Sequence, residues 1–447
     1  MTNTNMRLFA ASALAITIVL GGCGIASAEN AMKAIPQPDV GTLGVAPDSA
    51  RVDLKLPNFS NPTNVTNPLF PVSKQESILL AGTVDNKPFR TEVTLMPYTR
   101  IIAWEGIQIE TLVSQYVAFL DGRIQEVAYD LYAQADDGSV WYFGEDVNDF
   151  KDGVIFTKEG TWLVTRDGPP AMIMPGKPKV GDVFRAENMP GIAFEEVTIT
   201  AVGQTIDGPL GPITGTLQGN ELHMDDKTIS AKIFGPGYGE VLTRDADLEA
   251  LVLAVPTDAL SGAMPGELTQ LTNAALEAFT AAGSKDWKAT ATILKTMVAA
   301  WEKVQANPVP KPVITRLSAA LAELDSALSK KNAKKARHAA IEAARWSYDL
   351  QLRYRPVIDI NLARLDLWAA QILVDAEAKD AGSVKGDVFT LTYIADRLKL
   401  HLDPVARNKI NLLLGDLQPA ASDEEFNAAA EAAGKLRELV TGLAPKM

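Results

Sequence analysis

Residues 118–147 read AFLDGRIQEVAYDLYAQADDGSVWYFGEDV, and this stretch decides how the first half of the chain is expected to fold. Short runs of β-branched and aromatic residues alternate there with turns built on Asp-Gly pairs. Asp-Gly between alternating runs is a strong hairpin signal, because both central residues of a type I′ turn need positive φ. The same pair recurs along the chain, at residues 121–122, 137–138, 152–153, 167–168 and 207–208.

The spacing of these turns defines the wider architecture of the first half. Turns roughly a dozen residues apart, with no long helical pattern between them, indicate an antiparallel meander and argue against a parallel sheet. The sequence therefore predicts a curved or barrel-like antiparallel β domain over residues 76–258.

Residues 262–447 follow a different pattern, in which Ala and Leu are abundant and apolar residues repeat about every 3.6 positions. Asp286, Asn332, Asp380 and Asp423 precede successive helical segments at corresponding positions, about 45 residues apart. Asp or Asn at an N-cap accepts a hydrogen bond from an unpaired backbone N–H of the first turn. We therefore expect degenerate helical hairpins, stacked as a bundle or a short solenoid. The predicted fold class is α+β, with the β domain followed by an all-α domain.

The first 22 residues have the order of an export signal. Arg7 precedes an apolar run from Leu8 to Leu20, which is shorter than the roughly 20 residues that span a bilayer. The LGGC sequence that ends at Cys23 resembles a bacterial lipobox, in which the cysteine thiol takes a diacylglycerol and becomes the mature N-terminus. The ASA sequence at 26–28 also fits ordinary signal peptidase, which would release a soluble secreted or periplasmic form starting at Glu29.

Cysteine usage favours the anchored form. Cys23 is the only cysteine in 447 residues, so the chain has no disulfide framework, and a thiol at the end of the apolar run has an evident use as a lipid attachment site. Residues 23–75 are rich in Pro, Asn, Ser and Gly. We interpret them as the lipidated N-terminus, a tether and a turn-rich lead-in to the β domain.

Composition argues against several function classes. The net charge of −13 opposes binding to nucleic acid, which requires basic patches. Three histidines (His223, His338 and His401) and no second cysteine leave little for Zn or Cu sites or for Ser-His-Asp catalysis. His223, in the polar stretch NELHMDD, is expected in a solvated loop. No catalytic residue, metal site or cofactor is predicted, and no motif gives positive support to an enzyme.

Several segments of the β half resemble a family of uncharacterised exported bacterial proteins. The segments are NPTNVTNPLFPV, YDLYAQADDGSVWYFGEDVNDFKDG, EGTW, AMIMPGKPKVGDVFRAE and FGPGYGEV, within residues 60–243. The resemblance implies an exported β domain and assigns no activity. Ala135 stands where the family has an aspartate, which puts a role of that carboxylate in doubt here. The helical half, around LQLRYRPVIDINLARLDLWAAQILVDAEAKD, is similar to bundles of exported bacterial proteins, again without a named function.

Two groups of residues are candidate ligand or partner surfaces. In the β half, Trp141, Tyr142, Glu145 and Asp146 would form an aromatic patch with an acidic rim, and cross-strand aromatic packing is the structural alternative. In the helical half the group consists of Trp346, Tyr354, Asp359, Arg364, Asp366 and Trp368. Buried ion pairs that set helix register would explain this second group, and so would a pocket between helices.

Together these features predict an exported cell-envelope lipoprotein with a non-catalytic binding or scaffolding role. Diacylglycerol on Cys23 would hold it in the outer membrane or at the cell surface, and its partners would be an envelope protein or a small apolar ligand. A small-molecule or metal-ion binding protein is the first alternative. The second is a hydrolase of envelope polymers, which would need two carboxylates roughly 5 to 9 Å apart.

Overall fold

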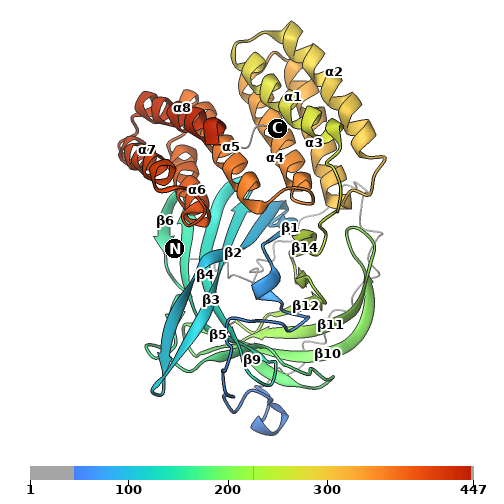
Figure 1. Ribbon diagram of the computed structural model, residues 1–447, viewed down its shortest axis with the longest axis vertical. Coiled ribbons are helices and arrows are strands. Elements are labelled where there is room, and N and C mark those ends of the chain that lie inside the picture. The colour runs from blue at the N-terminus through green and yellow to red at the C-terminus, as the bar shows by residue number, and fades with distance from the viewer. Residues whose placement is uncertain (1–44, 225, 444–447) are drawn as a thin grey trace. The chain divides into compact units, whose positions relative to one another are not determined.

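The computed structural model describes residues 45–224 and 226–443 (Figure 1). Cys23, the predicted signal sequence and the first part of the predicted tether lie outside the described residues. The chain divides into two compact units. The β unit holds the described residues up to Asp149 together with Ile155–Thr257. The helical unit holds Phe150–Val154 and the described residues from Asp258 onward.

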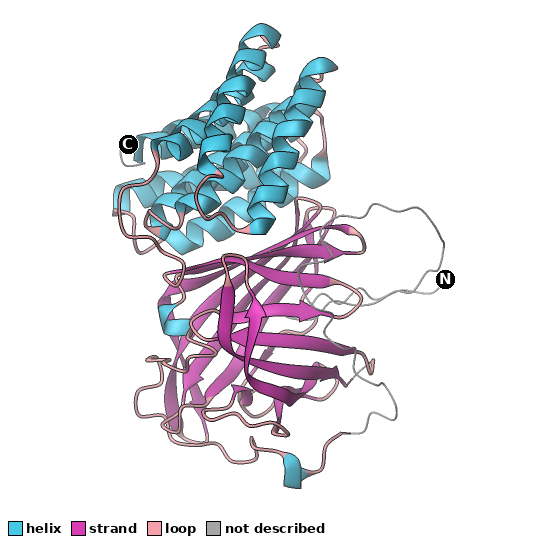
Figure 2. Cartoon of the chain, turned by 90° about the vertical axis from the view of Figure 1, so that its right-hand side faces the viewer, coloured by secondary structure: helices cyan, strands magenta, loops and turns pink. Residues whose placement is uncertain are grey.

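Within the described residues, the β unit is built on one antiparallel sheet of 14 strands, which curves strongly (Figure 2). Two meanders make up this sheet. Strands β1 to β6 pair in sequence order, strands β9 to β14 do the same, and the two meanders join where β1 pairs with β14. The short strands β7 and β8 both pair with β5 outside this path. The strands are β1 (Ser77–Val84), β2 (Lys87–Trp104), β3 (Ile107–Leu120), β4 (Arg123–Gln134), β5 (Val140–Lys151), β6 (Val154–Thr157), β7 (Trp162–Leu163), β8 (Ala171–Met174), β9 (Val183–Met189), β10 (Ala193–Asp207), β11 (Pro212–His223), β12 (Ile229–Gly235), β13 (Gly239–Arg244) and β14 (Leu248–Val255).

Residues with positive φ form the tight turns of the first meander. Asp121–Gly122 joins β3 to β4 with φ of 51° and 75°, and Asp152–Gly153 joins β5 to β6 with φ of 53° and 75°. Both turns agree with the Asp-Gly pattern. Asp85–Asn86, which that pattern does not mark, joins β1 to β2 in the same left-handed conformation. Asp167–Gly168 does not close a hairpin, because it links β7 and β8, which pair with β5 and not with each other.

Residues 45–75 pack against the β unit instead of forming a free tether. Arg51 forms a parallel bridge with Val183 of β9, and the backbone N–H of Ala46 donates to the Glu196 carboxylate at 2.8 Å. Val65 is fully buried in the main core of the unit. The described part of the predicted turn-rich lead-in thus packs against the β unit, and most of the predicted tether lies outside the described residues.

Aromatic side chains form much of the main core of the β unit. Trp141, Phe143 and Trp162 are buried there, and the Phe143 ring meets Phe59 of the lead-in edge-on, with 5.5 Å between centroids. Burying a large apolar side chain contributes about 1.5–3 kcal/mol to stability. The aromatic block of the sequence therefore stabilises the sheet through Trp141 and Phe143.

The described helical unit contains eight helices in two groups of four (Figure 1). In the first group, α1 and α3 each pack against both α2 and α4. The second group repeats this arrangement, because α5 and α7 each pack against both α6 and α8. The predicted helical bundle is confirmed, and with the antiparallel sheet it confirms the α+β fold class. The helices are α1 (Gly266–Gly283), α2 (Trp287–Val304), α3 (Lys311–Ser329), α4 (Ala333–Gln351), α5 (Val357–Glu377), α6 (Ala381–Leu398), α7 (Pro404–Ser422) and α8 (Phe426–Leu443).

Side-chain caps begin three of these helices at the predicted residues. The side chains of Asp286, Asn332 and Asp380 each accept a hydrogen bond from the backbone N–H three positions later. The prediction for Asp423 is wrong, because this residue is the C-cap of α7 and α8 begins at Phe426. Asp286 and Asp380 precede corresponding helices of the two groups, so the larger repeat in this unit is a set of four helices.

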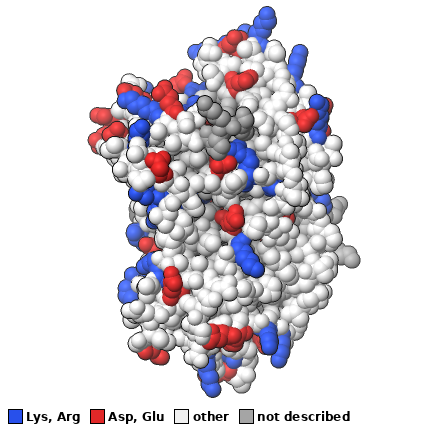
Figure 3. All heavy atoms as spheres, viewed as in Figure 1, with Lys and Arg blue, Asp and Glu red and all other residues white. Residues whose placement is uncertain are grey.

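In the described part of the chain, no helix combines the length and the apolar character that crossing a bilayer requires. On the face shown in Figure 3, acidic and basic side chains are interspersed, and no broad area of one sign stands out. Such a mixed surface is typical of charge that serves solubility.

Candidate functional site

A cavity of about 110 Å³ lies inside the β unit, and strands of both meanders contribute to its wall. Part of the wall is aromatic, formed by Phe70, Tyr116, Tyr132, Tyr142, Phe184 and Phe234. Another part is acidic, formed by Asp130, Glu187, Glu195, Glu221, Glu240 and Glu249. Among the described residues, Lys232 is the only basic side chain on this wall. A cavity with aromatic walls and convergent polar groups is the usual form of a small-ligand site.

A bulge in β5 brings Tyr142 and Glu145 to the same side of the sheet. In a regular strand these residues would point to opposite faces, because side chains alternate. Tyr142 pairs with Tyr132, but Glu145 pairs with Asp130, so β5 carries one extra residue between the two pairs. Gly144, at a φ of 140°, lies in this interval. An inserted residue of this kind re-aims the side chains that follow it.

Asp130, Glu145 and Glu187 come together as a buried carboxyl triad. The Tyr142 hydroxyl lies 2.7 Å from Asp130 Oδ1 and 3.1 Å from Glu145 Oε2. Glu145 and Glu187 lie within hydrogen-bonding reach of each other. Two carboxyl groups can share a hydrogen bond only if one of them carries a proton. The triad therefore holds at least one proton in this arrangement.

Burial sets the protonation of this triad. Desolvation raises the pKa of Asp130 to about 7, although the Tyr142 hydroxyl acts in the opposite direction. Burial, reinforced by neighbouring carboxylates, also raises the pKa of Glu145 and of Glu187 well above the usual range. A low-polarity environment disfavours the charged form of a carboxyl group. The triad therefore gains protons easily and gains negative charge with difficulty.

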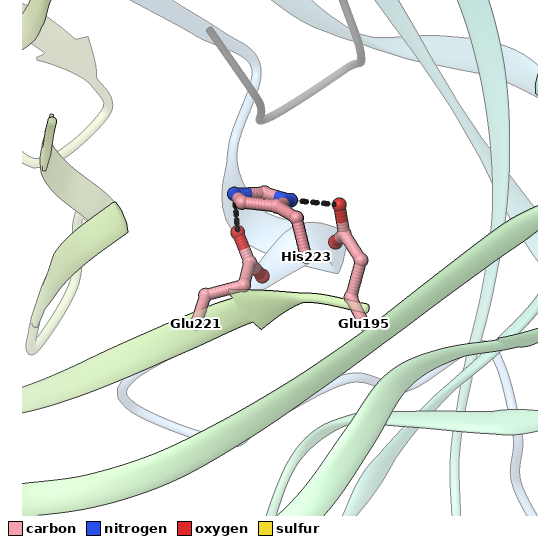
Figure 4. A group of neighbouring side chains, drawn as sticks. All are labelled: Glu195, Glu221 and His223. Carbon is pink, nitrogen blue, oxygen red and sulfur yellow. Dashed lines mark hydrogen bonds and ion pairs between the residues drawn. The ribbon is translucent and has the colours of Figure 1, made fainter. Parts of the chain in front are cut away.

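Glu195, Glu221, His223 and Lys232 form a second cluster, the His223 cluster, of which Figure 4 shows the first three residues. His223 Nδ1 lies 2.8 Å from Glu195 Oε1, and its Nε2 lies 3.9 Å from Glu221 Oε2. Lys232 Nζ lies 2.8 Å from the same Glu221 oxygen. Burial lowers the pKa of His223, but the nearby carboxylates outweigh it and raise this pKa to about 9. His223 is therefore a cation at neutral pH.

The His223 cluster has the form of an ion-pair network. Its three potential ligand residues, Glu195, Glu221 and His223, are close enough to hold a metal ion. However, the two carboxylates approach different nitrogens of one imidazole ring, and these nitrogens point in diverging directions (Figure 4). The solvated loop expected for His223 is wrong, because β11 extends through this residue and pairs it with Glu195 of β10.

The four candidate residues of the β half do not form one surface. Tyr142 lines the cavity, and Glu145 is buried in the carboxyl triad. Trp141 lies in the main core, where its indole N–H donates to the Ser139 hydroxyl at 2.7 Å. Asp146 is exposed. The expected aromatic patch with an acidic rim is thus split between the core, the cavity and the surface.

Several candidate residues of the helical half form contacts that join one helix to another. Arg364 pairs with Asp349 of α4 at 3.0 Å, and Asp366 pairs with Arg437 of α8 at 2.8 Å. Arg345 lies over the Trp368 ring, 4.5 Å from its centroid. These contacts agree with the structural alternative, in which ion pairs fix the helices relative to one another.

The remaining members of this group lie near the start of α5 or in α4. Asp359 pairs with Arg355 at 3.4 Å. Tyr354 is half-buried in the segment before α5, and Trp346 is buried in α4. None of these three contributes to the cavity of the β unit.

No protein-family model matches this sequence, and a comparison with curated proteins finds no match. The candidate site therefore has to be interpreted from its own chemistry. The residue Cys23, predicted to carry lipid, lies outside the described residues and stays a prediction.

Sequence reasoning missed most of the acidic wall of the cavity. Glu187, Glu195 and Glu221 come from three different strands, and no local motif connects them. One signal was present in Asp130, an acid in the aromatic and apolar run Tyr129–Tyr132, where most of the strand is buried. A charged residue at an inward position of a strand is the feature that would have marked these sites.

Proposed function

We propose that this chain is a cell-envelope lipoprotein whose β unit binds a small ligand in its internal cavity. The role is one of binding and not of catalysis. The observation that carries this proposal is the acidic wall of the cavity, where Glu187 Oε2 is buried and, apart from a proton shared with Glu145, has no hydrogen-bond donor among the described residues. An unpaired polar group in the interior costs stability, so a ligand that pairs with it would offset this cost.

The size of the cavity limits the ligand. A cavity of about 150 Å³ lined by apolar side chains holds one benzene molecule. The cavity here, about 110 Å³, therefore suits a molecule or a ligand group of about five heavy atoms. Rings from Tyr132, Tyr142 and Phe234 would contact the carbon atoms of such a ligand, while the acids would set its orientation.

The lipoprotein part of the proposal rests on the sequence. The lone Cys23 follows an apolar run of export-signal length, within a lipobox-like LGGC. The described part of the chain starts 22 residues later, so the intervening segment would separate the β unit from the lipid. An anchored binding protein in the cell envelope would hold its ligand close to the membrane.

Mass spectrometry of protein purified from its own envelope tests both parts. Under native conditions we expect a retained mass on the wild type, absent from Ala186→Leu, which fills the cavity. The control Ala103→Leu, at an exposed position of β2, should keep the retained mass. Ligand binding would be overturned if the wild type carried no added mass and Ala186→Leu were at least as stable as the wild type. Under denaturing conditions we expect a mature chain that begins at acylated Cys23, and a chain that begins at Glu29 would overturn the anchor.

A further inference from the structure

The acidic side chains of the cavity wall fall into two groups, which differ in whether a basic side chain is paired with them. In the His223 cluster, Glu221 has the ammonium of Lys232 at 2.8 Å and Glu195 has the imidazole of His223 at 2.8 Å. Neither Asp130 nor Glu187 forms an ion pair with a basic side chain among the described residues. The carboxyl triad therefore lacks an internal cation.

Unused acceptors lie in the same triad. Apart from the proton that Glu145 and Glu187 can share with each other, Glu187 Oε2 and Glu145 Oε1 are buried and accept no hydrogen bond from another group among the described residues. The side chains are 7% and 3% exposed, so bulk water reaches neither of them freely. Carboxyl oxygens in such surroundings need donors of N–H or O–H type.

We propose that the carboxyl triad is the subsite for the ammonium group of a small primary amine, an inference that rests on the proposed binding function. A primary ammonium has three N–H donors and one positive charge. It would supply the donors that Glu187 and Glu145 lack, and the cation that the triad lacks. Charge-assisted hydrogen bonds of this kind are about twice as strong as neutral ones.

The rings beside the triad suit a cation as well. Tyr132 and Tyr142 stack with 4.8 Å between ring centroids, and both line the cavity next to Asp130. The face of an aromatic ring attracts an ammonium group. A quaternary ammonium would also satisfy the rings, but it has no N–H to give to the unused carboxyl oxygens.

The chain already contains one example of the proposed chemistry. Lys232 is an alkylammonium on the cavity wall, held by Glu221 at 2.8 Å and approached by Glu240 at 3.7 Å. A divalent metal ion fits the triad less well, because calcium takes 6–8 oxygen ligands, and Asp130 Oδ1 and Glu145 Oε2 are already within reach of the Tyr142 hydroxyl.

Binding of an amine should depend on pH. The titratable groups that act most on the triad are Tyr132, Tyr142, Glu126, Glu195 and Glu221, and the two cations nearby, His223 and Lys232, are paired with Glu195 and Glu221. An ammonium must displace protons from the triad, so its affinity should rise as the pH rises. If one proton leaves for each amine bound, the affinity increases about tenfold per pH unit in the range where the triad titrates.

Calorimetric titration of the full mature chain with n-butylamine at pH 5, 6, 7 and 8 tests this inference. The neutral isostere 1-butanol and the anion butyrate serve as matched probes. We expect n-butylamine to bind at least tenfold more tightly than 1-butanol at pH 8. The advantage should shrink to less than threefold at pH 5.

Two conservative variants assign the effect to the triad. Glu187→Gln and Asp130→Asn should each weaken n-butylamine at least tenfold at pH 8 and leave 1-butanol within twofold. Asp146→Asn, at an exposed position of β5, should change neither probe. Unchanged 1-butanol binding also shows that a variant is folded with its cavity intact.

The outcomes separate this inference from the proposed function. If 1-butanol binds as tightly as n-butylamine at every pH, the cavity takes neutral ligands and the ammonium subsite is wrong. If Ca²⁺ alone binds the triad more tightly than n-butylamine, the subsite belongs to a metal ion. If none of the probes binds and no retained mass is found on native protein, the proposed binding function itself fails.

Discussion

Lys232 is the only basic side chain among the described residues that line the acidic wall of the cavity. Its ammonium is buried, and it pairs with Glu221 in the His223 cluster. Burial lowers the pKa of Lys232, but the carboxylates of Glu221 and Glu240 outweigh this and raise it. The cation therefore stays charged inside the sheet and compensates acids from two neighbouring strands.

Lys232→Met should lower the free energy of unfolding by about 3–5 kcal/mol at pH 8, because it leaves the Glu221 carboxyl buried without its partner. The double variant Lys232→Met/Glu221→Gln should recover most of this loss, since it removes the charge as well. Urea unfolding at pH 8 measures both values. If the double variant were no more stable than the single one, the ion pair would not be what Lys232 contributes.

At the scale of the element, β5 is the strand that builds the candidate site. Its bulge at Gly144 places Tyr142 and Glu145 on the same side, and so connects the aromatic and the acidic parts of the wall. A Cβ atom at residue 144 would lie 2.7 Å from the backbone oxygen of Trp162 in β7. Glycine is therefore required there both for its φ of 140° and for its lack of a side chain.

Gly144→Ala should destabilise the protein by about 1–3 kcal/mol through the strained φ alone. Overpacking against the Trp162 backbone should add about the same amount again. Gly191→Ala provides the comparison, because Gly191 has a φ of 82° but no neighbouring atom within 4 Å of the added carbon. Thermal unfolding of the two variants would contradict this account if their losses were equal.

The elements were predictable wherever a local rule governs them. The turns at Asp121–Gly122 and Asp152–Gly153, and the caps at Asp286 and Asp380, depend only on residues a few positions apart. Asp423 satisfied the same pattern but follows α7, because composition alone does not distinguish the end of one helix from the start of the next.

The candidate site was much less predictable than the elements. The triad forms only where side chains of β4, β5 and β9 meet. It also depends on one extra residue in β5, which reverses the alternation of side chains between the two faces of the sheet that a sequence pattern assumes. Tyr142 and Glu145 were singled out from the sequence, but for an exposed patch. Glu187 was not, because a lone acid in a strand is normally expected to face water.

At the scale of the whole molecule, the buried carboxyls influence how stability varies with pH. Burial raises the pKa of Asp130, Glu221 and Glu249 to about 7 in each case. The folded chain therefore holds protons that the unfolded chain has already released above a pH of about 4. Folding takes up protons in this window, so stability falls as the pH rises through it.

The ligand-free protein should accordingly be less stable at pH 8 than at pH 5. Asp130 alone accounts for a loss of about 2.5–3 kcal/mol between these pH values, because each of the roughly two pH units from 5 up to its folded-state pKa of about 7 costs about 1.4 kcal/mol. His223 acts in the same direction, because its raised pKa of about 9 gives stability that is lost as the pH rises through that value. Urea unfolding at the two pH values measures the difference, and Asp130→Asn should reduce it. Greater stability at pH 8 would contradict the assignment of these protons.

The pairing of β1 with β14 has a mechanical consequence. Ser77 lies opposite Val255, so the chain enters and leaves the sheet at the same point. A force applied at both of these ends would break the β1–β14 hydrogen bonds one after another, in unzipping geometry. It would not load all of them at once, as shear geometry does. The sheet therefore has low mechanical resistance to a force between its two ends. Residues 45–75, which contact β9 and the core, would be the first part of the unit to bear a force applied from the N-terminal side.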